Sequence, residues 1–352
     1  MRVTDLDTPA VVIDFDRVEA NLARVQALAD GLGLRLRPHV KTHKLPVLAR
    51  LQMDQGAVGI TCQKVGEAEA MAEGGLDDIL ITYNILGAAK LDRLARLHSR
   101  ITVAVVADSA ETVSGYASHF TDPSRPLSVL VECDTGAARC GVQTPAAALA
   151  LARNIAGSAG LRFGGLMTYP PRGDPARTEL WLAEAVAILR EADLPPPVVS
   201  NGGTPDLSRL ADVPSATEHR PGTYVYGDRM QVSFGAMRLE DCALTLRATV
   251  VSRPTPDRAV LDAGSKTLAA DLCALPGHGH IVEYPEAVIA SLSEEHGVVD
   301  LSASPRRPVI GEVLSIVPNH VCVVSNLFDH VNLARDGVVV ERLRVAARGS
   351  VS

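Results

Sequence analysis

Short β-branched runs alternate with helical stretches through the first two thirds of the chain, and the unit recurs every ~25 residues. Such alternation is typical of parallel strands joined by crossover helices. The predicted strands are Ala10–Phe15, Leu34–Val40, Val58–Gln63, Asp78–Tyr83, Ile101–Val106, Ser128–Asp134, Phe163–Tyr169 and Val198–Gly202. The helical stretches between them are Arg17–Leu32, Val65–Gly74, Ala88–Ser99, Asp108–His119, Ala146–Ala156 and Arg177–Ala192. Eight strands in this pattern predict a (β/α)8 TIM-like barrel rather than an open doubly wound sheet.

The pattern changes after about residue 235, where short strands follow one another without a helical period. These strands are predicted at Leu244–Val251, Arg258–Asp262, His280–Tyr284, Glu295–Leu301, Glu312–Ile316, His320–Val324 and Val338–Val345. They indicate a mostly antiparallel β domain. We therefore expect a barrel domain over residues 8–234 and a β domain over residues 235–352, with residues 1–7 packing on the β domain.

Composition and charge exclude several classes of protein. The 352 residues are 47% apolar, so the chain can bury a large core. A net charge of −7, scattered basic residues and 3% aromatic residues argue against nucleic-acid binding. No apolar run reaches the ~20 residues that span a bilayer, and the first residues lack the apolar core of a signal peptide. The six cysteines form no CxxC pair. We therefore expect a cytoplasmic protein with a small-molecule partner and no membrane association.

One lysine stands where a nucleophile is expected. Lys41 lies between His39 and His43, just after the alternating run Leu34–Leu36. A lysine at a strand end, beside groups that can hold it neutral, is a candidate Schiff-base nucleophile. The octapeptide Arg37–Lys44 read by itself favours an ordinary basic loop, because lysine and histidine are common in solvated turns.

Other polar residues also follow predicted strands. Gln63, Tyr83, Asp134, Tyr169 and Asn201 all fall at or just beyond C-terminal strand ends, as Lys41 does. In a (β/α)8 barrel these ends form the catalytic face. The sequence thus predicts one polar rim that carries the active site.

Two glycine-containing loops are candidates for a phosphate site. Ser200–Pro205 and Arg220–Tyr224 each combine glycine with threonine, so backbone N–H groups and a hydroxyl can converge on a phosphate. Loops after the last barrel strands commonly bind phosphate. Either loop alone is more often a simple turn. Arg139 follows a strand that ends in Glu132 and Asp134, and by itself it is better explained by a surface salt bridge.

The predicted β domain contains a possible metal site. His320 and Cys322 are two residues apart, and alternate residues of a strand face the same side. Nitrogen and sulfur ligands suit Zn²⁺, and only two protein ligands would leave positions for water or substrate. The His-x-Cys pattern is common by chance, so by itself the pair is more often part of the ordinary structure than a metal site.

With these motifs in order along the chain, the sequence resembles the D-threonine aldolase and D-serine dehydratase family. Its members are fold-type III pyridoxal-phosphate enzymes with an alanine-racemase-like barrel followed by a β domain. The match runs from Asp7-Thr8-Pro9-Ala10 to Ala347-Arg348-Gly349. Its motifs are Pro38–Lys44, Cys62–Lys64, Arg139–Val142, Gly202–Thr204, Pro221–Tyr224, Leu261–Gly264, Glu295–Val298 and Pro318–Cys322.

The resemblance implies a role for each motif. Lys41 would bind pyridoxal phosphate as a Schiff base, and Arg139 would approach the pyridine nitrogen, where a permanent cation disfavours ring protonation. His320 and Cys322 would hold a divalent metal, zinc or alternatively manganese, that binds the substrate's 3-hydroxyl. Members are typically homodimers. The implied cofactor-binding set is His39, Lys41, Gln63, Arg139, Tyr169, Asn201, Gly202, Gly203, Thr204, Gly222, Thr223 and Tyr224.

Two features separate this chain from parts of the family. D-Threonine aldolases carry His-x-Asp at the metal position and D-serine dehydratases carry His-x-Cys, as here, which favours a dehydratase-like site. A zinc ion there can act as a Lewis acid toward a departing hydroxyl. Second, the segment Tyr169–Gly173 replaces a histidine-containing turn by two prolines and Arg172, which removes an acid/base group near the substrate. Arg172 is a candidate partner for a substrate carboxylate.

Three classes of function remain open. The first is a metal-assisted lyase on a D-3-hydroxy amino acid, either by elimination of water to a 2-oxo acid and ammonia or by retro-aldol cleavage to glycine and an aldehyde. The second is an amino-acid racemase, which needs no metal but a second acid/base residue. The third is a non-catalytic pyridoxal-phosphate carrier, against which the β domain and its His-x-Cys pair argue. The lyase with elimination is the favoured prediction.

Overall fold

The computed structural model describes residues 1–352 and divides them into two compact units. The β unit comprises Met1–Ala23, Thr42–Leu45 and Thr223–Gly349. The barrel unit comprises Arg24–Lys41, Pro46–Gly222 and Ser350–Ser352. The short excursion Thr42–Leu45 and the later return of the chain to the β unit at Thr223 both begin inside motifs that the sequence singled out. The boundary between residues 234 and 235 stays a prediction.

Eight parallel strands form the sheet of the barrel unit, in the order β2-β9-β8-β7-β6-β5-β4-β3. Beyond the two ends of this order, His39 pairs with Thr61, and the Thr61 N–H donates to the Pro38 carbonyl at 2.7 Å. The sheet therefore curves round to meet itself, which confirms the predicted TIM-like architecture. The strands are β2 (Arg35–Leu36), β3 (Ile60–Cys62), β4 (Asp78–Ile81), β5 (Thr102–Ala107), β6 (Leu127–Cys133), β7 (Leu161–Thr168), β8 (Val199–Asn201) and β9 (Glu218–His219).

The first predicted barrel strand belongs elsewhere. Strand β1 (Ala10–Asp14) pairs antiparallel with β10 (Leu244–Thr255) and parallel with β16 (His330–Arg335), all in the β unit. The assignment of Ala10–Phe15 to the barrel was therefore wrong. The eighth barrel strand is the two-residue β9, which is too short to show a period in sequence. A buried strand has the same apolar pattern in either sheet, so the pattern could not distinguish them.

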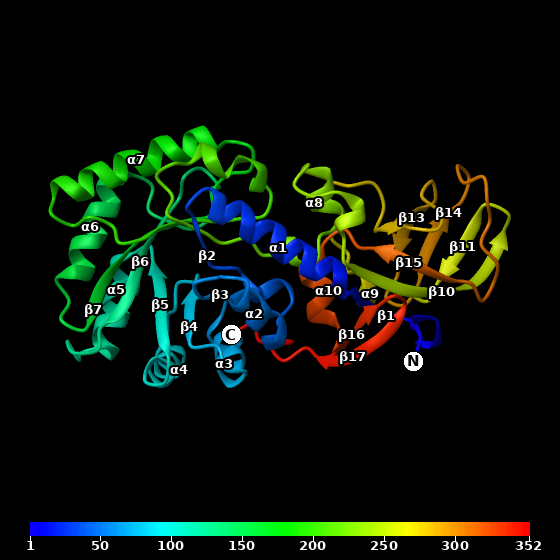
Figure 1. Ribbon diagram of the computed structural model, residues 1–352, viewed down its shortest axis with the longest axis horizontal. Helices are drawn as coiled ribbons and strands as arrows, with labels where there is room; N and C mark the ends of the chain where they lie inside the picture. Colours follow the sequence, from blue (N-terminus) through cyan, green and yellow to red (C-terminus); the bar gives the residue numbers. More distant parts are fainter. The chain divides into compact units, whose positions relative to one another are not determined.

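Helices follow most barrel strands, and Figure 1 shows α4, α6 and α7 outside the strands. Three begin with side-chain caps that the sequence supplies: Ser109, Thr144 and Asp174 each accept a backbone N–H of the first turn. No helix in the structure is both long and apolar enough to cross a bilayer. The helices are α1 (Phe15–Gly31), α2 (Pro46–Asp54), α3 (Val65–Glu73), α4 (Ala88–His98), α5 (Ala110–His119), α6 (Pro145–Ala156) and α7 (Pro175–Glu191).

The β unit contains a nine-stranded sheet in which every pairing except β1 with β16 is antiparallel. This confirms the mostly antiparallel β fold. Two of its strands, β13 (Val288–Leu292) and β16, were not predicted. The others are β11 (Arg258–Leu261), β12 (His280–Ile281), β14 (Gly297–Asp300), β15 (Val313–Val317) and β17 (Val338–Arg344). Short helices complete the unit: α8 (Arg229–Ser233), α9 (Ser265–Leu268) and α10 (Val321–Leu327).

One correction affects the candidate metal site. The segment His320–Val324 was predicted as a strand, but His320 is the N-cap of α10 and Cys322 lies in its first turn. The β-branched residues of this segment have the composition of a strand. Contacts of His320 and Val321 with Asp228 nevertheless fix the start of a helix here. Alternation along a strand is therefore not what could bring the two side chains together.

Candidate active site

The predicted rim residues lie at the C-terminal ends of the parallel strands. Gln63 follows β3, Tyr169 follows β7, and Asn201 is the last residue of β8. Tyr83 and Asp134 likewise follow β4 and β6 by one or two residues. Because all strands of the barrel unit run in one direction, these side chains share one end of it.

Lys41 lies in a 3-10 turn, Val40–Thr42, that follows the segment after β2. Its backbone N–H donates to His39 Nδ1 at 3.4 Å, and His39 Nε2 lies 3.1 Å from Gln63 Oε1. The amide of Gln63 in turn donates to the Thr82 carbonyl at 2.9 Å. Since Gln63 Oε1 can only accept, Nε2 of His39 carries the proton and Nδ1 is the acceptor. The half-buried lysine thus stands on a fixed polar network.

The two predicted phosphate loops lie side by side. The Gly222 N–H donates to Thr204 Oγ1 at 3.2 Å, and the Arg220 N–H donates to the Asn201 carbonyl at 3.0 Å. The His39 N–H donates to the Pro221 carbonyl at 2.8 Å, so the loops also adjoin the segment that carries Lys41. The N–H of Gly222 is thus already hydrogen-bonded to Thr204, and the N–H of Gly202 donates to Asn201 Oδ1 at 3.0 Å.

Glycine is required at both central positions of the first loop. Gly203 has φ of +127°, where side chains are strained. A Cβ at Gly202 would lie 2.7 Å from the guanidinium of Arg220. A loop without side chains beside a hydroxyl-bearing neighbour, Thr204, is a surface that a phosphate can approach closely.

Arg139 and Tyr169 are brought together with this loop. The guanidinium of Arg139 lies 4.7 Å from the centre of the Tyr169 ring, and a Cβ built at Gly203 would lie 3.4 Å from the same ring. Arg139 is exposed and Tyr169 is 40% exposed, so both face accessible space. Arg172, in the loop after β7, is also exposed, and this loop is held where the Gly173 N–H donates to Asp206 at 3.0 Å.

Arg220 is a buried cation that the sequence analysis did not select. Its Nε donates to Ser200 Oγ at 2.8 Å and its Nη2 donates to the Thr168 carbonyl at 2.5 Å. Burial lowers the pKa of Arg220 to about 10, which leaves it charged at neutral pH. The signal was present in the motif Arg220–Tyr224, of which only the glycine, threonine and tyrosine were interpreted.

Glu132 is a second missed residue, on β6 inside the barrel. It is 4% exposed, and Asn84 donates to its carboxyl at 3.4 Å. Burial raises the pKa of Glu132 to about 7, although the nearby charge of Arg139 acts in the opposite direction. With this pKa the carboxyl of Glu132 is partly protonated near neutral pH.

The raised pKa of Glu132 predicts a pH dependence of stability. The folded protein holds the proton to a pKa of about 7 and the unfolded chain only to 4.5, so protonation stabilises the fold below pH 4.5 and this gain is lost as pH rises through 7. Relative to Glu132→Gln, the wild-type free energy of unfolding should fall by on the order of 3 kcal/mol between these limits. Urea unfolding of both proteins from pH 4.5 to pH 8 measures this. A constant difference would contradict it.

The candidate metal ligands lie in the β unit. His320 Nδ1 is 2.9 Å from Asp228 Oδ2, and Cys322 Sγ is 3.3 Å from Thr42 Oγ1 and 3.9 Å from Thr223 Oγ1. Burial alone lowers the pKa of His320, but the Cys322 thiolate and then Asp228 raise it, and the net pKa is about 11. One of the causes is a hydrogen bond between the His320 and Cys322 side chains, so the structure does bring the pair together.

The donor set fits a metal with open coordination positions. No group of three or more His, Cys, Asp or Glu side chains is arranged to hold a metal ion, so protein ligands would number two. An imidazole nitrogen and a thiolate are the ligands that zinc prefers. The pair therefore fits a catalytic type of site that water or substrate completes, and does not fit a closed structural one.

Two residues that contact Cys322 are direct chain neighbours of predicted cofactor residues. Thr42 directly follows Lys41, and Thr223 directly follows Gly222. Both hydroxyls contact Cys322. Tyr224, the last predicted phosphate residue, is 1% exposed. Every residue of the predicted cofactor set thus lies on the rim of the barrel unit or within two residues of it along the chain.

Comparison with known families identifies the architecture. The family model described as the alanine racemase N-terminal domain matches residues 13–230, more than half of the chain. The chain belongs to the alanine racemase-like family. In this alanine racemase-like protein a second family model, a putative serine dehydratase domain, matches residues 243–334. The resemblance found from the sequence motifs is therefore confirmed.

Relatives with named activities cover nearly the whole alanine racemase-like chain. D-Threonine aldolase from Arthrobacter sp is 36% identical over 360 residues, with 98% of this chain and 93% of the aldolase covered. D-Threonine aldolase from Filomicrobium marinum superposes with a TM-score of 0.92 at 33% identity, covering 99% of this chain and 97% of that one. A D-threo-3-hydroxyaspartate dehydratase, solved as a cysteine-to-alanine mutant in the metal-free form, superposes with a TM-score of 0.88 at 31% identity. The superposition covers 98% of this chain and 99% of the dehydratase.

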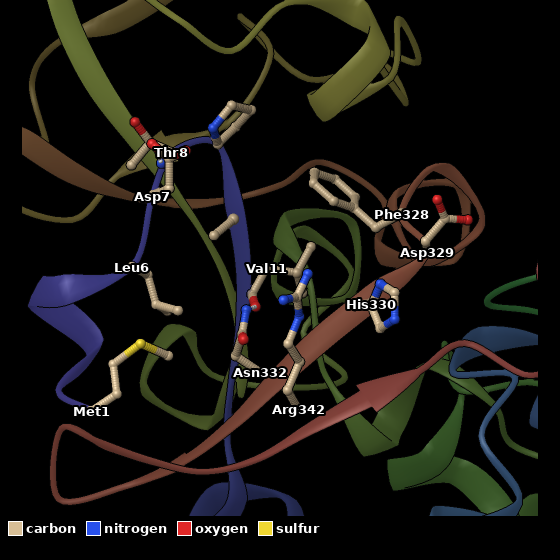
Figure 2. A pocket seen from close by; sticks show the side chains of 12 residues that line it. Met1, Leu6, Asp7, Thr8, Val11, Phe328, Asp329, His330, Asn332 and Arg342 are labelled. Carbon is tan, nitrogen blue, oxygen red and sulfur yellow. Dashed lines mark hydrogen bonds between the residues drawn. The ribbon is translucent and has the colours of Figure 1, made fainter.

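Two cavities of this alanine racemase-like protein contain none of the predicted site residues. One of about 390 Å³ lies in the β unit, and its lining includes Asp7 and Thr8 of the N-terminal segment together with His330, Asn332 and Arg342 (Figure 2). Another, of about 320 Å³, is lined by residues that precede or begin barrel strands, among them Thr102, Ser128 and Arg162. The second cavity lies at the end of the barrel opposite the catalytic rim.

Proposed function

We propose that the protein is a pyridoxal-phosphate- and divalent-metal-dependent lyase that eliminates water from a D-3-hydroxy amino acid, giving a 2-oxo acid and ammonia. The observation that carries this proposal is the 3.3 Å contact between Cys322 Sγ and Thr42 Oγ1, because Thr42 is the next residue after Lys41. The candidate metal thiol thus contacts the residue that directly follows the candidate cofactor lysine in the sequence. A racemase needs no such thiol.

Lys41 supplies the base and the anchor for the cofactor. Bound pyridoxal phosphate withdraws electrons from the substrate's α-carbon. Nζ of Lys41 then accepts the α-proton, while the His39 and Gln63 network keeps the 3-10 turn in place. Gly203, Thr204, Thr223 and Tyr224 would hold the phosphate, with Gly202 and Gly222 leaving room for it. Arg139, which lies against the Tyr169 ring, would disfavour protonation of the pyridine ring, and Asn201 fixes the first loop by accepting the Gly202 N–H.

His320 and Cys322 hold the metal. A divalent ion held by them would supply a Lewis acid for the departing 3-hydroxyl, and the His-x-Cys pair favours zinc over manganese. A relative with dehydratase activity has been solved in a metal-free form, which indicates that a metal normally belongs to that enzyme. Arg172, exposed after β7, would contact a carboxylate on the substrate's side chain.

Retro-aldol cleavage to glycine and an aldehyde is the second candidate. It is favoured by the D-threonine aldolase that is 36% identical over nearly the full chain. That reaction needs a base for the hydroxyl proton instead of a departing hydroxyl, and the same two ligands could serve it. We further propose a cytoplasmic homodimer. All six cysteines are free, which suits a reducing compartment.

One experiment separates these reactions. The purified protein, loaded with pyridoxal phosphate and zinc, is incubated with D-serine, D-threonine, D-threo-3-hydroxyaspartate and D-phenylserine, and the products are identified by mass spectrometry. We expect a 2-oxo acid from at least one of the first three. Glycine would select the aldolase. Inversion at the α-carbon that persists in chelator would select the racemase and refute the lyase.

A further inference from the structure

Asp228 is a buried carboxylate whose contacts converge on the candidate metal ligand. It is completely buried and follows the Thr223–Val225 turn by three residues, at the N-cap of α8. Oδ1 accepts the Gln231 N–H at 2.8 Å, which caps that helix. Oδ2 accepts from two partners of the other segment, the Val321 N–H at 3.1 Å and His320 Nδ1 at 2.9 Å. One side chain therefore fixes the start of α10 and the ring of its N-cap residue.

The carboxylate is itself held rigidly. The Arg229 N–H donates to the Pro318 carbonyl and the Met230 N–H to the Asn319 carbonyl, each at 3.1 Å. Arg229 Nη1 also donates to Asn319 Oδ1 at 2.7 Å. These contacts bind α8 to the residues just before His320, so Asp228 and the imidazole keep their mutual position without a metal.

This geometry determines which ring nitrogen can bind a metal. An ionised carboxylate oxygen only accepts, so Nδ1 of His320 carries the proton that faces Asp228. The second nitrogen, Nε2, must then be the atom that hydrogen-bonds the Cys322 side chain. Nε2 and Sγ consequently point at one place, where a shared proton now lies and where a metal would replace it.

We propose that Asp228 is the positioning residue of the metal site, a carboxylate that fixes the tautomer and orientation of His320 and raises the affinity of Nε2 for the metal. Because Asp228 acts through His320, its role rests on the proposed metal site. Loss of such a partner typically weakens metal binding by about 10–100-fold. The chain position gives no hint of this role, since Asp228 and His320 are 92 residues apart.

Asp228→Asn tests the role while keeping the cap of α8, because asparagine is as good an N-cap as aspartate. Zinc affinity of the pyridoxal-phosphate-loaded protein is measured by competition with a chromophoric chelator. We expect the dissociation constant to rise about 10–100-fold while cofactor content stays near wild type. Asp174→Asn, which changes the equivalent N-cap of α7, is the matched control and should keep wild-type affinity.

Two outcomes would refute the proposal, and they are distinguishable. Wild-type zinc affinity in Asp228→Asn would remove the positioning role and leave the metal site intact. A wild-type protein that binds no zinc would refute both the positioning role of Asp228 and the proposed metal site. Should Asp228→Asn not fold, Asp228→Ser keeps a capping oxygen but cannot replace the second carboxylate oxygen, and the same rise in dissociation constant is expected.

Discussion

Lys41→Ala should abolish covalent fixation of pyridoxal phosphate by borohydride and reduce turnover by on the order of 10⁴-fold or more. The lysine sits on the catalytic rim of a confirmed barrel, one residue from a contact with Cys322. Lys41 is the only primary amine in the predicted cofactor-binding set, so it alone can both anchor the cofactor covalently and accept the α-proton. The measurement is absorbance of the protein after borohydride and denaturing gel filtration, which removes cofactor that is only held non-covalently.

Lys64→Ala is the matched control for this experiment. Lys64 also follows β3 at the same rim, and its ammonium lies 3.6 Å from the centre of the Tyr83 ring. It should retain borohydride-fixed cofactor. Fixation that survives in Lys41→Ala and disappears in Lys64→Ala would transfer the anchoring role to Lys64.

The fold was predictable wherever a period was long enough to be seen. Seven of the barrel strands and six of its helices have clear runs in sequence, and their existence decided the architecture. The two-residue β9 carries no period at all, and β1 carries one that fits either sheet. Membership of a strand in a sheet depends on partners far away in the chain, such as Asn332 opposite Val12, and local pattern contains no information on these.

In the candidate site, too, residues marked by local sequence pattern were predicted and residues that depend on distant partners were missed. Lys41, Gln63, Tyr169 and Asn201 were predicted because strand direction alone places them on one rim. Arg220 and Glu132 were missed because their importance lies in burial, which only the folded barrel creates. Asp228 was missed since its partners belong to another segment of the chain. The His320–Cys322 pair was selected for a wrong reason: strand alternation was assumed, whereas a capped helix start brings the side chains together.

Cys322→Ala should remove metal and activity together while pyridoxal phosphate stays bound, because Cys322 is not among the residues proposed to hold the cofactor. With one ligand of a two-ligand site gone, we expect zinc content below one tenth of the wild-type value at micromolar free zinc, and turnover reduced on the order of 10²-fold or more. Metal analysis and cofactor absorbance at matched protein concentration measure this. Cys273→Ala is the control, since that half-buried thiol interacts electrostatically with His320 and lies in the same unit.

The same site should lose its metal as pH falls. Metal binding requires Cys322 as thiolate and His320 with a free Nε2, so at least one proton is displaced when the metal enters. Zinc affinity should then weaken by about tenfold for each unit of pH below neutrality, and added zinc should restore activity at the lower pH. Chelation at neutral pH should act in the same way and be reversible. A wild type that is fully active without metal would falsify this scheme, and the amino-acid racemase, which needs no Lewis acid, would become the better account of the chain.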